Sequence, residues 1–133
     1  MTKYLIAYGA TMLVFFAIDF VWLGVVAKDF YRERLGALML EQVNLPVAAV
    51  FYLIYIVGIV VFAVSPALQA GSWKTALMLG GLFGFIAYGT YDVTNLATLR
   101  GWPVSVVIVD MTWGTVLTGV SAALGYAITR YFA

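Results

Sequence analysis

Residues Val47–Val64, VAAVFYLIYIVGIVVFAV, decide the fold class, because this run carries no charged side chain. About 20 apolar residues in a helix, rising ~1.5 Å each, span the hydrocarbon core of a bilayer. Three further stretches of similar or greater length each contain a single charged residue. We therefore predict an all-α integral membrane four-helix bundle that forms one transmembrane domain over residues 1–133, with spans at about 4–27, 47–65, 75–99 and 102–129.

The overall composition agrees with this reading. The chain is 65% hydrophobic and 10% charged, with a mean hydropathy of +1.03, whereas soluble domains carry about 25% charged residues. It has no cysteine and no histidine, which excludes disulfides, thiolate or histidine metal ligands and histidine acid–base catalysis. A net charge of +1 gives no indication of nucleic-acid binding. The sequence predicts neither a metal site nor a cofactor.

The only sizeable loop is predicted between the first two spans, over residues 28–46. Tyr31, Leu35, Leu38 and Met39 recur in it at helical spacing with charged residues between them, which predicts a short amphipathic helix lying in the membrane interface. Asn44 and Pro46 suit the start of the second span. Ser65-Pro66 is predicted to end that span or begin its exit, and Gly71-Ser72 to form the next turn. Arg100–Pro103 is predicted to turn tightly into the fourth span.

Positive charges divide almost evenly between the two membrane faces. Face A is the one predicted to carry Lys3, Lys74 and Arg130, and face B the one predicted to carry Lys28, Arg32, Arg34 and Arg100. Cytoplasmic loops are enriched in lysine and arginine. Three residues against four favour a cytoplasmic face B only slightly.

Each charged span holds one aspartate, and the three are predicted to lie at one depth. Asp19 precedes the end of the first span by eight residues, Asp92 precedes the end of the third by eight, and Asp110 follows the start of the fourth by eight. Eight residues of helix are roughly 12 Å, and all three of these helix ends are predicted on face B. Carboxylates inside a bilayer are costly and mark candidate functional sites.

Each aspartate also has polar or aromatic neighbours on its own helical face, because residues three and four apart lie side by side. We expect these side chains to point inward and share a cavity in which at least one acid holds a proton. The candidate ligand-binding or proton-linked residues are Asp19, Trp22, Tyr88, Asp92, Asn95, Asp110 and Trp113.

Other readings of the same residues stay open. Intramembrane acids, amides and tyrosines also join helices through hydrogen bonds without binding any ligand. Gly80-x-x-x-Gly84 has the spacing of a helix dimerisation motif, and serves equally for packing within one chain. The charged residues of 28–41 form either a solvated face or a lid over the cavity.

Three segments carry a resemblance to a known family: Asp19–Gly24 (DFVWLG), Tyr88–Asn95 (YGTYDVTN) and Asp110–Gly114 (DMTWG). Over its whole length the chain resembles the family of small bacterial inner-membrane proteins designated domain of unknown function 2177. The resemblance implies a multi-pass protein of the bacterial inner membrane with four helices. It implies no reaction.

Three functions fit these observations. The first is binding or transport of a small or lipidic molecule, coupled to protons or selective for a cationic or polyhydroxylated headgroup, with dimerisation expected for a transporter of only four helices. The second is a structural or assembly subunit whose acids join helices or pair with a partner membrane protein. The third is an enzyme acting on a membrane lipid, with one aspartate as general acid and another as base or Mg²⁺ ligand.

Overall fold

The computed structural model describes residues 1–133 and contains only helices, which confirms the all-α prediction. Two of the spans include a short π-helical segment, marked η1 and η3, and η2 is a 3-10 turn. The elements are α1 Thr2–Val21, η1 Trp22–Val26, α2 Phe30–Leu35, η2 Gly36–Leu38, α3 Leu45–Ile59, η3 Val60–Val64, α4 Ser65–Ala70, α5 Trp73–Thr98 and α6 Val104–Phe132. Four continuous helical stretches are long and apolar enough to cross a membrane: Thr2–Val26, Leu45–Ala70, Trp73–Thr98 and Val104–Phe132.

The second span is longer than predicted from the position of Pro66. Ser65-Pro66 does not end the span, which continues through α4 to Ala70. Proline lacks the N–H that bonds the preceding turn, and here it follows directly after η3, where the hydrogen-bond pattern has already changed. Gly71 ends the span in the left-handed conformation, with φ +66°. At the other end the side chain of Asn44 caps the helix by accepting from the Val47 amide at 3.2 Å, as predicted.

The fourth span begins later than predicted, at Val104, because Trp102 and Pro103 still belong to the turn. The amphipathic helix is also shorter than predicted. It ends at Leu35, because Gly36 has φ +43° and breaks the helical path. Leu38 lies in the 3-10 turn that follows, and Met39 has extended backbone.

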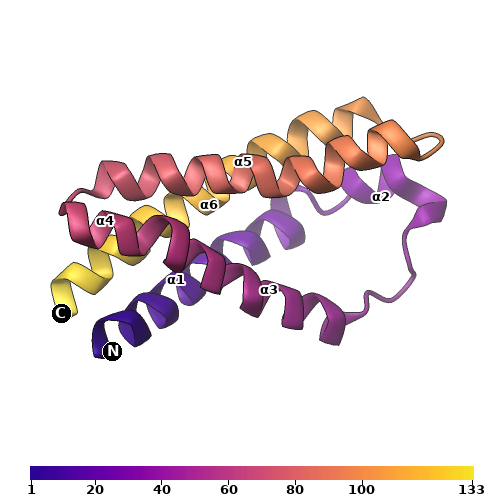
Figure 1. The fold of residues 1–133 in the computed structure, drawn as a ribbon. Helices are drawn as coiled ribbons and strands as arrows, with labels where there is room; N and C mark the ends of the chain where they lie inside the picture. The colour runs from indigo at the N-terminus through magenta and orange to yellow at the C-terminus, as the bar shows by residue number, and fades with distance from the viewer.

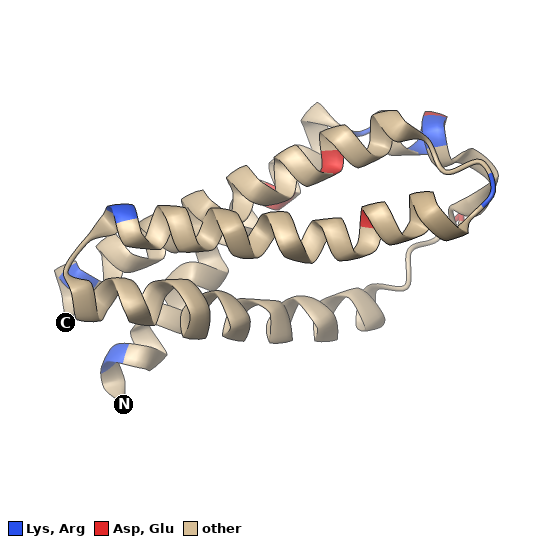
Figure 2. Cartoon of the chain, turned by 45° about the horizontal axis from the view of Figure 1, so that its top comes forward, with Lys and Arg blue, Asp and Glu red and all other residues tan.

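The helices lie roughly along one axis, with both termini at the same end (Figure 1). Lys and Arg gather at the two ends of the bundle, and the intramembrane acids lie in the half away from the termini (Figure 2). Only 30 of 133 residues are buried, and many large apolar side chains face outward, among them Leu13 at 73% and Met78 at 73% exposure. Such a surface is suited to lipid, so the chain is a multi-pass membrane protein.

The close pair in the bundle is α5 with α6, which lie side by side (Figure 1). Their contact depends on glycines: a β-carbon at Gly80 would lie 2.8 Å from that of Ala122, and one at Gly84 would collide with the carbonyl oxygen of Gly114. The Gly80-x-x-x-Gly84 motif is therefore used within the chain. By contrast, α3 diverges from the other spans toward its N-terminal end, the end nearest α2 (Figure 1).

Candidate functional site: an acidic and aromatic cavity

A cavity of about 590 Å³ lies at the face-B end of the bundle, where α3 diverges. All four spans contribute to its walls, and α2 with the connector to α3 contributes the rest. Its lining residues are Asp19, Trp22, Leu23, Tyr31, Leu35, Met39, Val43, Phe51, Tyr52, Tyr55, Ala87, Tyr88, Tyr91, Val106, Asp110 and Trp113. Asp19 and Asp110 are the only charged residues among them, and eight of the others are aromatic.

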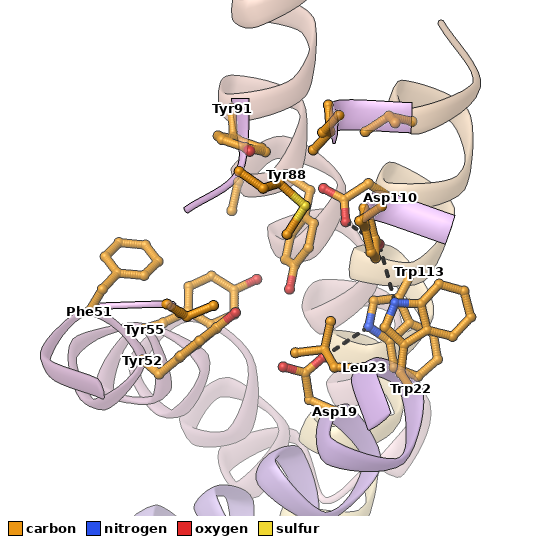
Figure 3. A pocket seen from close by; sticks show the side chains of 16 residues that line it. Asp19, Trp22, Leu23, Phe51, Tyr52, Tyr55, Tyr88, Tyr91, Asp110 and Trp113 are labelled. Carbon is orange, nitrogen blue, oxygen red and sulfur yellow. Dashed lines mark hydrogen bonds between the residues drawn. The ribbon is translucent and has the colours of Figure 1, made fainter. Parts of the chain in front are cut away.

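Two tryptophans stack at the wall between the first and fourth spans. The rings of Trp22 and Trp113 are 4.2 Å apart between centroids and inclined by 9°. The first and fourth spans run antiparallel, so their Asp-x-x-Trp pairs, Asp19 with Trp22 and Asp110 with Trp113, lie side by side in opposite directions. The indole of Trp113 accordingly donates to Asp19 Oδ1 at 3.1 Å, across the helix interface (Figure 3).

Tyr31 links the other tryptophan, Trp22, to the other acid, Asp110. Trp22 donates from its indole nitrogen to the Tyr31 hydroxyl at 3.2 Å, and that hydroxyl donates to Asp110 Oδ1 at 2.7 Å. Burial, and then the nearby charge of Asp110, raise the pKa of Tyr31 above its ordinary value, so the hydroxyl remains a donor at physiological pH. Tyr31 thus connects α2 to an intramembrane acid.

Tyr31 was not among the predicted site residues. The sequence offered one signal for it: it begins the apolar side of an amphipathic segment on the face nearest the three acids. Trp102, Val106 and Val107 form the small apolar cluster against which α2 packs, and Leu35 also contacts it. This packing turns the apolar side of α2, Tyr31 included, toward the cavity, while Arg32 and Glu33 remain exposed.

Asp92 does not line the cavity. It is fully buried, at 0% exposure, and neither of its oxygens meets a hydrogen-bond donor. Its carboxyl group lies against that of Asp110. Two carboxylates in contact repel each other, whereas a carboxylic acid donates to a carboxylate. That at least one of the acids holds a proton stays a prediction.

Of the remaining predicted residues, Tyr88 lines the cavity and Asn95 does not. The ring of Tyr88 occupies the space that a β-carbon at Gly114 would take, so the small residue in α6 places this ring. Asn95 is half-buried on α5, one turn beyond Asp92. No group of three or more Asp or Glu side chains is close enough together to hold a metal ion.

A wall of tyrosines from α3 and α5 faces Asp19 across the cavity. The hydroxyls of Tyr52, Tyr55 and Tyr88 point inward (Figure 3). Tyr55 forms a hydrogen bond with Thr118 at 2.9 Å, whereas those of Tyr52 and Tyr88 have no partner in the protein. Tyr52 and Tyr55 were not among the predicted site residues, because a tyrosine in an apolar span resembles an ordinary packing residue.

Together these features define an α-helical, four-span membrane protein with an acidic and aromatic cavity at one end. The chain belongs to the family described as "Predicted membrane protein (DUF2177)", whose model matches residues 4–127 and confirms the resemblance noted above. No curated protein and no solved structure matches the chain.

Proposed function

We propose that this protein binds a small or lipidic molecule in the cavity and holds or carries it within the bacterial inner membrane. The observation that carries the proposal is the cavity itself. Its volume of about 590 Å³ falls within the ~300–1,000 Å³ of small-molecule sites and far exceeds the ~30 Å³ share of one water. A few polar groups among many aromatic side chains are typical of such sites.

The distribution of satisfied and free polar atoms supports the same proposal. Polar groups that only join helices are expected to find partners within the protein. Asp19 uses one oxygen for Trp113, and the hydroxyls of Tyr52 and Tyr88 use none of their capacity on protein groups. These atoms surround one space and are free to bind a ligand. The position of Asp92 beside Asp110 makes proton-linked binding part of the proposal, because two neighbouring carboxyl groups favour retention of a proton.

A structural role is the second candidate, and a specific observation favours it. The bonds from Trp113 to Asp19 and from Tyr31 to Asp110 join the first span, α2 and the fourth span. In a structural or assembly subunit the acids would serve only to form these bonds. A partner membrane protein or a second copy of the chain would then cover the lipid-facing surface.

Native mass spectrometry with lipidomics of the purified protein separates the two candidates. Binding predicts a defined molecule that co-purifies with the wild type, is lost from Asp19→Asn and Asp110→Asn, whose side chains line the cavity, and is retained by Asp29→Asn. Asp29 is the matched control, because it is an exposed acid at the same membrane face. The same spectra report the oligomeric state.

The structural role predicts a different pattern. All four proteins would carry the same unselected lipids, and the two intramembrane variants would melt at clearly lower temperature than Asp29→Asn. That result would overturn the binding proposal. A changed lipid composition in cells that produce the wild type, absent with Asp110→Asn, would instead indicate a lipid-modifying enzyme.

A further inference from the structure

The charged and polar groups of the cavity indicate which class of ligand it takes. The lining contains two acids and no lysine or arginine. Asp19 and Asp110 are only 6% and 9% exposed. Buried charges are stable when they are paired and hydrogen-bonded, yet no basic side chain forms a salt bridge with either acid, since the one salt bridge of the chain joins Arg34 to Glu33.

The two acids differ in their surroundings. The Tyr31 hydroxyl donates to Asp110 Oδ1, and the second acid near Asp110 is the buried Asp92. Asp19 accepts from Trp113 through Oδ1, and its other oxygen points into the cavity (Figure 3). Asp19 is therefore the acid whose free acceptor faces the open part of the cavity.

The surroundings of that free oxygen add further acceptors. The hydroxyls of Tyr52 and Tyr88 face it across the cavity without protein partners. A group that donates several hydrogen bonds and carries positive charge matches this arrangement, because carboxylate and hydroxyl oxygens accept its protons and aromatic faces attract its charge. A carboxylate or phosphate would meet the acids with like charge.

The rest of the cavity is apolar. Leu35 of α2, and Met39 and Val43 of the connector to α3, lie with Leu23 and Phe51 in its lining. Leu35, Met39 and Val43 lie outside the spans at the face-B end, whereas Asp19 lies further into the membrane. The cavity thus combines an acidic inner part with an apolar outer part.

We propose that the ligand is an organic ammonium ion with a flat apolar body, whose charged head is held by Asp19 among the tyrosine hydroxyls. The apolar body lies against the aromatic walls, against Leu35 of α2 and against the connector from α2 to α3. This inference rests on the proposed function and names the chemical class of its ligand.

Three probes that share one ring system and differ in charge test the inference: 2-naphthylmethylammonium, the neutral 2-naphthylmethanol and the anionic 2-naphthoate. Each is measured by equilibrium dialysis against the full chain in lipid nanodiscs, and binding to empty nanodiscs is subtracted. The ammonium is expected to bind at least about tenfold more tightly than the alcohol, and the carboxylate not measurably. A hydrogen bond to a charged group is typically worth about a tenfold change in affinity or more.

Variants then assign the preference to a residue. Asp19→Asn keeps an oxygen that accepts from Trp113, and is expected to abolish the ammonium's advantage over the alcohol. Asp29→Asn, on the surface, is expected to preserve it. Equal binding of ammonium and alcohol to the wild type would overturn the inference, as would an unchanged preference in Asp19→Asn or no binding of the ammonium.

The wild-type comparison decides the charge preference even where a variant fails to fold. Failure here is distinguishable from failure of the proposed function. If the alcohol or the carboxylate binds as well as the ammonium, or if native mass spectrometry still finds a defined co-purifying molecule, the cavity is a binding site for another class of ligand.

Discussion

At the scale of single residues, the cavity wall is held by hydrogen bonds between side chains from distant parts of the chain. Tyr31 and Asp110 are 79 positions apart, and Trp113 and Asp19 are 94 apart. In each pair the donor is an aromatic side chain with a single polar hydrogen. Such donors satisfy an intramembrane carboxyl group and bring no charge of their own.

Replacement of Tyr31 by phenylalanine tests how α2 is held over the cavity. Tyr31→Phe keeps the ring but removes both the donor to Asp110 and the acceptor for Trp22. A hydrogen bond to a charged group contributes about 1.5–3 kcal/mol, so we expect faster amide hydrogen exchange in residues 30–35 and little change in the four spans. Tyr131→Phe, at a position 83% exposed, is the control and should leave exchange unaltered. Unchanged exchange in Tyr31→Phe would show that apolar packing alone holds α2.

At the scale of the elements, the α5–α6 pair is the frame that places the site. Tyr88, Asp92 and Asp110 all lie on it, and Gly80 and Gly84 bring the two helices close enough for the acids of both to touch. The α2 segment, by contrast, is a short helix closed by Gly36. One wall of the cavity is therefore built on long, closely packed helices, and another part on a short helix held by Tyr31 and by its packing at the start of α6.

A methyl group at Gly114 is expected to disturb both the helix pair and the cavity. Gly114→Ala places a β-carbon where the Tyr88 ring lies, and overpacking of this kind typically costs about 1–3 kcal/mol. We expect a lower melting temperature and weaker ligand binding, because Tyr88 has to leave its place in the wall. Gly9→Ala, where nothing lies within 4 Å of the added carbon, is the matched control and should melt at or slightly above the wild-type temperature. If Gly114→Ala melts like Gly9→Ala, the ring of Tyr88 has room to move.

At the scale of the whole molecule, the bundle has a different character at each end. Face A carries both termini and the turn at Gly71. Face B carries α2, the connector and the cavity. The protein is thus asymmetric across the membrane, and a ligand that enters through the α2 segment would do so from one side only.

The absence of cysteine makes this arrangement directly measurable. Single variants Glu41→Cys and Ala133→Cys place a thiol on exposed residues at face B and face A respectively. A membrane-impermeant maleimide added to intact cells is expected to label one of the two, and the other only after the membrane is permeabilised. Labelling identifies the cytoplasmic face, which the nearly even distribution of lysine and arginine leaves undecided. Equal labelling of both in intact cells would contradict a four-span topology.

Much of the fold and part of the candidate site were predictable from hydropathy and spacing alone. Charge-free runs of membrane length required four helices, because a bilayer offers no partner for unpaired backbone groups. Helical periodicity placed Trp22 beside Asp19 and Trp113 beside Asp110, and the span count placed the three acids at one depth. Asp19 and Asp110 do line one cavity, and Asp92 lies directly behind Asp110.

The tertiary structure alone decided which of these side chains face the cavity. Periodicity specifies the residues that share a face of one helix, but the rotation of that helix about its axis is set by packing against its neighbours. That packing turned Asp92 inward against Asp110, left Asn95 outside the lining, and crossed the two Asp-x-x-Trp pairs. The contributions of Tyr31, Tyr52 and Tyr55 depend on contacts between distant segments, with α2 folded back over the bundle and α3 diverging from it. Such contacts minimise exposed polar groups and empty space in three dimensions, and no local pattern of residues encodes them.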